Sequence, residues 1–467
     1  MSDFKFKTKP FAHQLKVFME SRRKRNFALL MEQGTGKTKV ALDTAAYLYL
    51  NEKIDTLVVI APNGVHRNWV NKEVPIHMAC DHKATFYSAQ MKKKQQENFD
   101  AVLEYKDGLR IFSFNVEAFT SAVAQKAMMK VLKNNKVMMV VDESSKIKTP
   151  GAKRTKLITF FGRSAVCRRI LTGTPVTKGP EDLFAQFKFL NPDILGFTAF
   201  YKFRARYCIM GGFENRQIVA YQNIEELTDK VNQSSYRVLK KDCLDLPAKI
   251  YQRHYVSMSK AQEKLYNELK RDFITELNGE EMQAPEAITR LLRLQQILCG
   301  WFPTEHSIEP IDKINLRLKG LEEVLSNITG KVIIWARFRA DLKAIEGLLG
   351  SQAVSYHGGV SDDDREEAVS RFQNDDKVRY FISNPQAGGT GLTLTAAEYA
   401  IYYSNSFDLE QRLQSEDRCH RIGTTGNVTY IDIECQKSID TKIIKALRDK
   451  KNLADIITKD PRSLFME

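Results

Sequence analysis

The sequence predicts an α/β protein made of two parallel-sheet lobes with a helical insertion between them. Short, continuous apolar runs separated by amphipathic stretches occur in two series, one before residue 180 and one after residue 311. The strands of a parallel sheet are buried on both faces, so they read as continuous apolar runs of this kind. Between the two series, residues 258–300 contain two long helical patterns, which predict a helical insertion.

The first series defines a lobe over residues 1–245. Its expected strands are residues 27–31, 56–61, 108–113, 137–141 and 169–172, and a helix is expected over residues 40–50. An aromatic-rich segment at 184–203 and a glycine-led hairpin at 211–223 follow these strands. Strands that alternate with helices indicate a doubly wound sheet.

The insertion and its linker are expected over residues 246–310, and the second lobe over residues 311–467. Two long helical patterns, 259–277 and 285–298, make up the insertion. The expected strands of the second lobe are residues 331–335, 378–382, 399–403 and 428–433. Trp335 ends the first of these strands, so we expect it in the core.

Composition narrows the class of protein. No apolar run approaches the roughly 20 residues of a membrane-spanning helix, so we expect no membrane partner. The seven cysteines are scattered and form no Cys-x-x-Cys pair, which argues against a zinc site or a disulfide framework and favours a reducing compartment. We therefore expect a cytoplasmic protein, in the host bacterial cytoplasm if the source is viral.

The 71 Lys and Arg against 57 Asp and Glu give a net charge of +14, which favours the capture of polyanions.

A glycine-rich segment follows the first expected strand and precedes a helix. The strict phosphate-loop pattern requires a glycine five positions before Gly36, where this chain has Met31. The rest of the pattern is present: Gly34 and Gly36 let backbone N–H groups approach phosphate oxygens at a helix N-terminus. Lys37 supplies a cation for the β- and γ-phosphates, and Thr38 supplies a hydroxyl for magnesium.

Two carboxylates come directly after the expected strand that ends at Val141. The end of a parallel strand directs such groups at the crevice where nucleotides bind. Asp142 would hold magnesium, directly or through water, and Glu143 would orient or deprotonate the attacking water.

A pair of arginines lies near the C-terminus. Arg418 and Arg421 are three residues apart, a spacing that places them on adjacent turns of one helix face. A permanently charged guanidinium with five donors suits the charge that develops on a transferred phosphoryl group.

These three segments and their order make the chain resemble a superfamily-two helicase-type motor of the Swi/Snf branch. Further segments occur in the family's order. They are Gln14, residues 60–63 with Trp69 following, residues 113–115, 171–175, 333–337, 356–359 and 383–394. The resemblance spans roughly residues 9–435 and implies two RecA-like lobes, ATP and Mg²⁺ as cofactors, and a nucleic-acid partner.

The resemblance assigns roles to individual residues. The implied ATP-binding set is Gln14, Gly34, Thr35, Gly36, Lys37, Thr38, Asp142, Glu143, Gly391, Arg418 and Arg421. Lys37, Glu143, Arg418 and Arg421 would be catalytic, and Thr38 and Asp142 would hold the metal. The implied DNA contacts are Pro62, Asn63, Asn115, Arg337, His357, Gly388 and Gly389. Lys146 and Lys148 are added as DNA contacts because they belong to a basic cluster beside Asp142 and Glu143.

Two residues depart from the family pattern. Ser145 stands where many relatives have His, so the acid segment would contact residues 171–175 differently. Thr424 stands where the Swi/Snf branch usually has Gln. These departures favour a compact bacteriophage or bacterial member over a nucleosome remodeller.

The expected function is ATP-driven translocation on double-stranded or branched DNA. Such a motor would remodel replication, recombination or repair intermediates by branch migration, fork reversal or limited unwinding, with phage or host replication and recombination proteins as candidate partners. Two alternatives stay open at this point: an RNA helicase, and an ATP-dependent DNA-binding clamp that does not travel.

Overall fold

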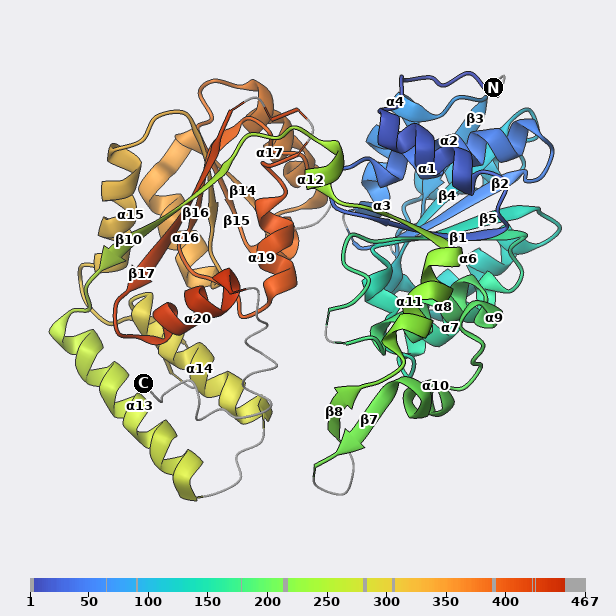
Figure 1. The fold of residues 1–467 in the computed structure, drawn as a ribbon. Coiled ribbons are helices and arrows are strands. Elements are labelled where there is room, and N and C mark those ends of the chain that lie inside the picture. The colour runs from blue at the N-terminus through green and yellow to red at the C-terminus, as the bar shows by residue number, and fades with distance from the viewer. Residues whose placement is uncertain are drawn as a thin grey trace. The chain divides into compact units, whose positions relative to one another are not determined.

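The computed structural model describes residues 4–63, 65–89, 91–177, 179–212, 217–279, 284–304, 307–388, 392–421, 423–424 and 426–449. Contacts divide the chain into two compact units, Met1–Asp245 and Leu246–Glu467. Each unit contains one large sheet whose paired strands all run parallel, so the predicted class of two parallel-sheet α/β lobes is confirmed (Figure 1).

The sheet of the first unit has seven strands in the order β3-β4-β2-β5-β6-β1-β9. Their bounds are β1 Asn26–Met31, β2 Thr56–Ala61, β3 His82–Phe86, β4 Leu109–Asn115, β5 Val137–Asp142, β6 Cys167–Leu171 and β9 Ser235–Val238. The central strand β5 (VMMVVD) is buried at every position. Burial on both faces explains why its sequence is a continuous apolar run.

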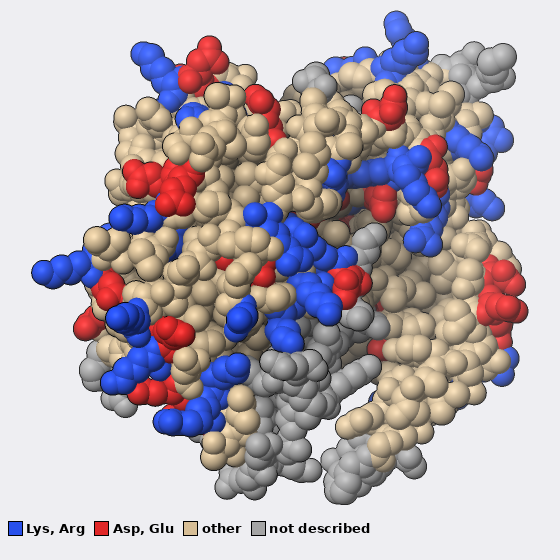
Figure 2. All heavy atoms as spheres, turned by 60° about the vertical axis from the view of Figure 1, so that its left-hand side comes forward, with Lys and Arg blue, Asp and Glu red and all other residues tan. Residues whose placement is uncertain are grey.

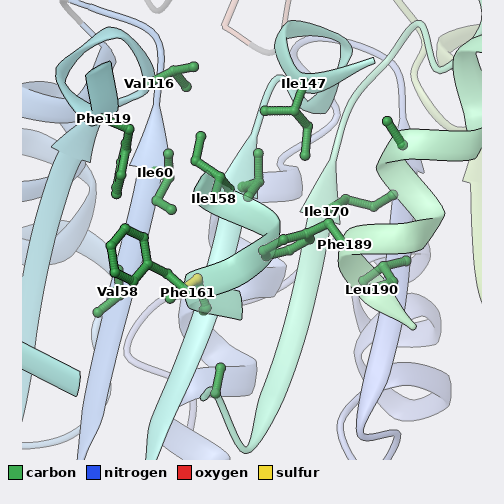
Figure 3. Packing of buried hydrophobic residues seen from close by; sticks show 14 of the residues in the cluster. Val58, Ile60, Val116, Phe119, Ile147, Ile158, Phe161, Ile170, Phe189 and Leu190 are labelled. Atoms are coloured by element: carbon green, nitrogen blue, oxygen red, sulfur yellow. The ribbon is translucent and has the colours of Figure 1, made fainter. Parts of the chain in front are cut away.

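Neighbouring residues of each strand enter two different cores, one on each face of this sheet. Val58 and Ile60 of β2 pack with Phe161, Phe189 and the helices α7 (Lys153–Gly162) and α8 (Asp182–Leu190). Figure 3 shows these side chains converging from strands and helices. Leu57 and Val59 point to the other face and pack with α1 (Ala12–Ser21) and α2 (Lys37–Leu50). The period of two along the strands thus builds the doubly wound arrangement.

The other elements of the first unit are short or lie at its edges. The helices are α3 Val65–Asn68, α4 Val74–His77, α5 Lys93–Leu103, α6 Ala122–Leu132, α9 Pro192–Leu195, α10 Phe200–Tyr207, α11 Ile224–Gln233 and α12 Lys240–Cys243. A π-helical turn, η1, covers Trp69–Glu73, and the 3₁₀ turns η2 and η3 cover Val116–Thr120 and Ser144–Ile147. The expected hairpin consists of β7 (Cys208–Gly211) and β8 (Gln217–Tyr221), paired antiparallel.

The second unit has a six-stranded sheet in the order β10-β17-β16-β13-β15-β14. Their bounds are β10 Lys249–Val256, β13 Lys331–Trp335, β14 Ala353–Tyr356, β15 Tyr380–Ser383, β16 Ala397–Tyr402 and β17 Val428–Cys435. The two short strands β11 (Trp301–Pro303) and β12 (Ile308–Pro310) form a separate antiparallel pair. The helices and turns are α13 Lys260–Gly279, α14 Ala284–Leu298, α15 Leu316–Ser326, α16 Arg339–Leu349, η5 Gly350–Gln352, α17 Asp362–Asn374, α18 Pro385–Gly388, α19 Leu409–Glu416 and α20 Ile439–Arg448.

The segment expected as insertion and linker contributes to the second sheet. β10 lies within residues 246–310 and pairs with all eight residues of β17, from Val428 to Cys435. Its residues are half-buried or exposed, because it forms an edge of the sheet, and so it has no continuous apolar run. The two expected helices are present as α13 and α14, which pack with α20 in a common core. Within the described residues no helix is long and apolar enough to cross a membrane.

Candidate nucleotide and nucleic-acid sites

The glycine segment connects β1 to α2, as expected for a phosphate-binding turn. Gly34 and Gly36 have φ angles of 79° and 87°, in the left-handed region that side chains disfavour. A Cβ added at Gly36 would lie 2.1 Å from Nε2 of Gln14, so both conformation and space require glycine there. The first backbone N–H groups of α2 have no partner within the helix, and this turn leaves them directed outward from the helix end.

Gln14 hydrogen-bonds the backbone of the glycine segment. The side chain is 3% exposed, and its Nε2 donates to the carbonyl of Thr35 over 3.1 Å. The backbone N–H of Phe11 donates to its Oε1 over 3.0 Å. A ring nitrogen of His13, a residue outside the predicted set, lies 2.8 Å from the same Thr35 carbonyl. Two side chains of α1 therefore fix the middle of the phosphate turn.

Asp142 ends β5 and lies in a buried polar pocket. Its Oδ2 accepts a hydrogen bond of 2.9 Å from the indole of Trp69, and its Oδ1 accepts one of 3.0 Å from the backbone of Glu143. Burial, and then the neighbouring charge of Glu143, raise the pKa of Asp142 above its ordinary value. Trp69 resembles part of a nucleic-acid contact in sequence, but it is 1% exposed and serves instead to orient this carboxylate.

Glu143 has a strained backbone and an incomplete set of partners. Its φ of 48° and ψ of 59° are left-handed, which is uncommon for a residue other than glycine. Its Oε1 accepts from Nζ of Lys37 over 3.0 Å and from Nε2 of Gln33 over 3.4 Å. Its Oε2 is buried and has no hydrogen-bond partner among the residues that the structure describes. A buried carboxylate oxygen without a partner is a group that a bound water would satisfy.

These residues fit a magnesium–nucleotide. Asp142 and Thr38 offer hard oxygen donors, the kind that Mg²⁺ prefers together with phosphate oxygens. Lys37 is 8% exposed, so its cation lies in a site that excludes most water, where attraction to a phosphate is strong. The first unit thus brings Gln14, Gly34 to Thr38 and the two carboxylates together at one edge of its sheet.

Helix α8 links the acid segment to residues 171–177. The hydroxyl of Ser144 donates to Oε1 of Gln186 over 2.6 Å, and Nε2 of Gln186 donates to the carbonyl of Pro175 over 2.7 Å. Gln186 is fully buried. We expected contacts different from those of the family at Ser145, and in this chain the preceding residue, Ser144, makes one such contact.

A second link lies one turn earlier on α8. Oδ2 of Asp182 accepts from the backbone and the hydroxyl of Thr177 over 2.8 and 2.7 Å. Nζ of Lys148 lies 3.6 Å from the same oxygen and also hydrogen-bonds the hydroxyl of Thr177. The segments that follow β5 and β6 are therefore joined through two side chains spaced four residues apart on one helix.

In the second unit the expected helical placement of the two arginines is wrong. Helix α19 ends at Glu416, because the N–H of Arg418 bonds the carbonyl of Ser415 in a tighter turn. Arg418 and Arg421 lie in the following turns and converge all the same, since Nη1 of each donates to the carbonyl of Leu392, over 3.1 and 3.0 Å. Leu392 follows Gly391, whose predicted nucleotide contact falls outside the described residues.

The arginine segment is supported by a buried charge network. Arg412, on α19, pairs with Asp432 of β17 over 2.5 Å and with Glu416 over 2.8 Å. Its guanidinium carbon lies 3.4 Å from the ring centroid of Tyr402. Lys249 of β10 reaches Glu416 over 3.0 Å. These partners enclose Arg412, which fixes the helix that leads into Arg418.

The predicted DNA contacts in the first unit differ in accessibility. Pro62 is buried and its carbonyl accepts from the first turn of α3, whereas Asn63 is exposed. Asn115, at the end of β4, and Lys146, in η3, are half-buried. Lys148 is half-buried and pairs with Asp182.

In the second unit the described residues that were predicted to contact DNA are engaged in contacts within the protein. Arg337 donates to Oε1 of Gln295 over 3.2 Å and stacks on Phe407, and burial lowers its pKa to about 10. His357 has Nε2 3.0 Å from Glu346, and its Nδ1 accepts from the N–H of Gly359 over 3.1 Å. Gly388 is buried against Ser383 and Trp335, where a Cβ would lie 2.4 and 2.7 Å from their side chains. Gly389 lies outside the described residues, and the core position of Trp335 is confirmed by its zero exposure.

The surface carries both signs of charge. On the face drawn in Figure 2, Lys and Arg side chains are interspersed with Asp and Glu. The excess of positive charge over the whole chain thus does not make this face uniformly basic. Sequence reasoning missed Gln33, Gln186 and His13, because each acts through a partner distant in sequence or through a backbone carbonyl.

Residues 12–300 match the model of the SNF2-related domain, and residues 316–423 match the helicase conserved C-terminal domain. The chain is 27% identical over 461 residues to the SWI/SNF chromatin-remodeling complex subunit snf22 of Schizosaccharomyces pombe, covering 92% of this chain and 26% of the relative. It is 26% identical over 436 residues to the mouse DNA annealing helicase and endonuclease ZRANB3, covering 90% of this chain and 38% of the relative.

The chain therefore spans about a quarter to two fifths of the length of these curated relatives. Among solved structures it is similar to the Sulfolobus solfataricus SWI2/SNF2 ATPase core in complex with dsDNA, with a TM-score of 0.43 and 21% identity, covering 100% of this chain and 97% of that one.

Proposed function

Since this chain belongs to the SNF2-related domain family, we propose that it is an ATP-driven translocase that acts on double-stranded or branched DNA. The matches to the SNF2-related domain and the helicase conserved C-terminal domain support an ATP-hydrolysing enzyme. The observation that carries the proposed site is the buried Lys37–Glu143 pair beside the glycine segment, with the second oxygen of Glu143 lacking a partner.

The roles proposed in the first unit follow from the contacts. Backbone N–H groups at the start of α2 would bind the phosphates, and Lys37 would exchange Glu143 for a phosphate oxygen. A released Glu143 carboxylate would orient the attacking water and accept its proton as the bond between the γ-phosphorus and the bridging oxygen breaks. Magnesium, held by Asp142 and Thr38, would neutralise charge on the phosphate oxygens.

The second unit is proposed to complete the site. Arg418 and Arg421 would leave the carbonyl of Leu392 for the γ-phosphate when the two units close on ATP. Hydrolysis would reopen the units, and repeated cycles would move the protein along one strand. The links from α8 between the acid segment and residues 171–177 are suited to transmitting the state of the phosphate to the chain that follows β6.

DNA as the track is supported by the relatives' names, which include chromatin remodelling and a DNA annealing helicase. The net charge of +14 favours a polyanionic partner as well. The proposed work is branch migration, fork reversal or limited unwinding in replication, recombination or repair. A cytoplasmic location, a phage or bacterial origin, and partners among replication proteins stay predictions.

Stimulation of ATPase activity tests the proposed substrate. Wild-type protein is assayed with duplex DNA, four-way junctions, single-stranded DNA and RNA, each at several concentrations. We expect the largest stimulation by duplex or junction DNA. Stronger stimulation by RNA would favour the RNA-helicase alternative. DNA stimulation without movement would favour the clamp.

A further inference from the structure

A basic pocket lies where the strands of the first sheet begin, whereas the nucleotide site lies where they end. Its volume is about 520 Å³. The residues that line it are Arg22, Arg23, Lys24, Arg25, Tyr47, Leu48, Asn51, Lys53, Ile54, Val166 and Cys167. Arg25, Ile54 and Val166 come just before strands β1, β2 and β6, whereas the glycine segment follows β1. Six strand residues separate the two edges, about 20 Å at roughly 3.3 Å per residue.

The charge of this pocket is of one sign. Five of its lining residues are Lys or Arg, and none is Asp or Glu. The C-terminal ends of α1 and α2 also lie here, and each contributes about half a negative charge from its dipole. Half a charge from each of two helix ends, against five full charges, leaves the pocket strongly cationic. Compensation of the helix ends alone does not explain five basic residues.

One residue that lines the pocket, Arg22, has a buried guanidinium nitrogen without a partner among the described residues. Arg22 is 7% exposed and packs against the rings of Phe18 and Tyr47, at 5.5 and 5.1 Å from their centroids. Its Nη1 is buried and has no hydrogen-bond partner within the described part of the chain. A buried donor without a partner destabilises the protein, and a charged donor does so more strongly, so a ligand that accepts from Nη1 removes this cost.

The basic turn is also held in place by an unusual anchor. Arg169 is fully buried, and its guanidinium donates to the carbonyls of Ser21, Lys24 and Arg25 over 2.7 to 3.0 Å. No ion pair of Arg169 with a carboxylate occurs among the described residues, and burial lowers its pKa. Its charge therefore adds to the positive potential beneath the turn. The turn is preorganised, so little ordering is needed when a ligand binds.

We propose that this pocket binds phosphate groups, as a second anion site distinct from the glycine segment. Guanidinium forks match phosphate oxygens in pairs, and a multiply charged phosphate suits five cations better than a single carboxylate does. The phosphate has two candidate sources, the backbone of a nucleic acid or a small molecule such as pyrophosphate or a nucleotide. The proposal does not depend on the motor function, because none of its residues belongs to the ATP site.

Two triple variants of equal charge test the proposal. The variant R23Q/K24Q/K53Q removes three exposed charges of the pocket, and K92Q/K93Q/K94Q removes three exposed charges from the start of α5, outside it. Each protein is titrated with a labelled 20-base-pair duplex from 50 to 200 mM salt. Sodium pyrophosphate is titrated separately into the same proteins carrying K37A, which removes the lysine of the first phosphate site.

If the pocket binds the phosphate backbone of a nucleic acid, the pocket variant should bind duplex at least tenfold more weakly than the control variant. The dependence of its affinity on salt would be shallower by about 0.9 for each phosphate that the variant no longer neutralises. A small phosphate predicts instead a tenfold weaker affinity for pyrophosphate, with duplex binding equal to the control. Equal behaviour of the two variants in both titrations would overturn the proposal.

Arg22 provides an independent test. R22M keeps the aliphatic packing on Phe18 and Tyr47 and removes the unpaired guanidinium. In the K37A background, pyrophosphate should raise the melting temperature with Arg22 present and leave it unchanged with R22M. Without ligand, R22M should melt no lower than its parent. A pyrophosphate shift of the same size in both proteins would contradict a phosphate site at Arg22.

Discussion

The charged groups of the two units are arranged in opposite ways. In the first unit Lys37 and Glu143 form a buried pair in which one carboxylate oxygen has no partner and the backbone of Glu143 is strained. In the second unit Arg412 is enclosed by Asp432, Glu416 and the ring of Tyr402. The first arrangement is incomplete until a ligand enters, whereas the second is complete without one.

The difference separates residues that take part in ATP hydrolysis from residues that hold the structure in place. Strain and missing partners are tolerated where a bound phosphate and water would repair them. A network that is already satisfied instead fixes the position of the chain that follows it, here the turns bearing Arg418 and Arg421. Substitutions in the first group should therefore impair turnover, and those in the second should impair stability.

The largest effect is expected at Arg421. Arg421→Ala removes a half-buried guanidinium that donates to the backbone carbonyl of Leu392 and that we propose moves to the γ-phosphate. Its loss should therefore lower kcat by about 10³-fold or more. DNA binding should change little. Arg371→Ala, which removes an exposed arginine of α17, is the control and should keep wild-type turnover. Normal turnover in Arg421→Ala would show that this arginine does not act on ATP.

Glu143→Gln should lower turnover by about 10²- to 10⁴-fold, because the amide cannot accept a proton from water. ATP binding should be retained, since Lys37 no longer needs to leave an ion pair. Single-turnover hydrolysis together with binding of a fluorescent nucleotide measures both quantities. If ATP binding were lost together with hydrolysis, Glu143 would have a structural role and not a role in activating water.

Arg412→Met should affect stability and not the chemistry directly. Removing one partner leaves Asp432 and Glu416 buried with fewer partners, which costs about 3–5 kcal/mol. Amide hydrogen exchange should quicken in α19 and β17 while the strands of the first unit keep their protection. If protection stays unchanged in α19, the network is not the support that we infer.

The strands that the sequence predicted well are those buried on both faces. β2 and β13 have the predicted bounds, because their five and four apolar residues are each placed in one of the two cores that flank their sheet. The edge strands β3 (HKATF) and β10 (KIYQRHYV) were missed, since half-exposed residues leave no apolar run. Strand prediction from apolar runs is therefore strongest at the centre of a sheet and weakest at its edges.

The site divides in a similar way. Lys37, Asp142 and Glu143 were predictable because they are adjacent to strand ends, where local sequence shows their context. Gln186 was not, since its partners Ser144 and Pro175 are 42 and 11 residues away. The end of α19 at Glu416 depends on one backbone bond, that of Arg418 to Ser415, which residue spacing does not reveal.

The smallest effect on stability is expected for Ser144→Ala combined with Gln186→Leu. Replacing Ser144 and Gln186 together leaves neither side chain of their own hydrogen bond unmatched, whereas Gln186→Leu alone also strands the Ser144 hydroxyl and should be the less stable variant. Both variants lose the bond from Nε2 of Gln186 to the Pro175 carbonyl. The double variant should still hydrolyse ATP but move less DNA for each ATP. Translocation coupled to ATP consumption as in wild type would show that α8 transmits nothing between the two segments.

Displacement of the third strand of a DNA triplex tests the central claim most directly, because it requires movement along a duplex without separation of its strands. We predict ATP-dependent displacement by the wild-type protein, and none by Glu143→Gln or with a non-hydrolysable ATP analogue. ATP hydrolysis stimulated by the duplex, with the third strand still bound, would contradict translocation.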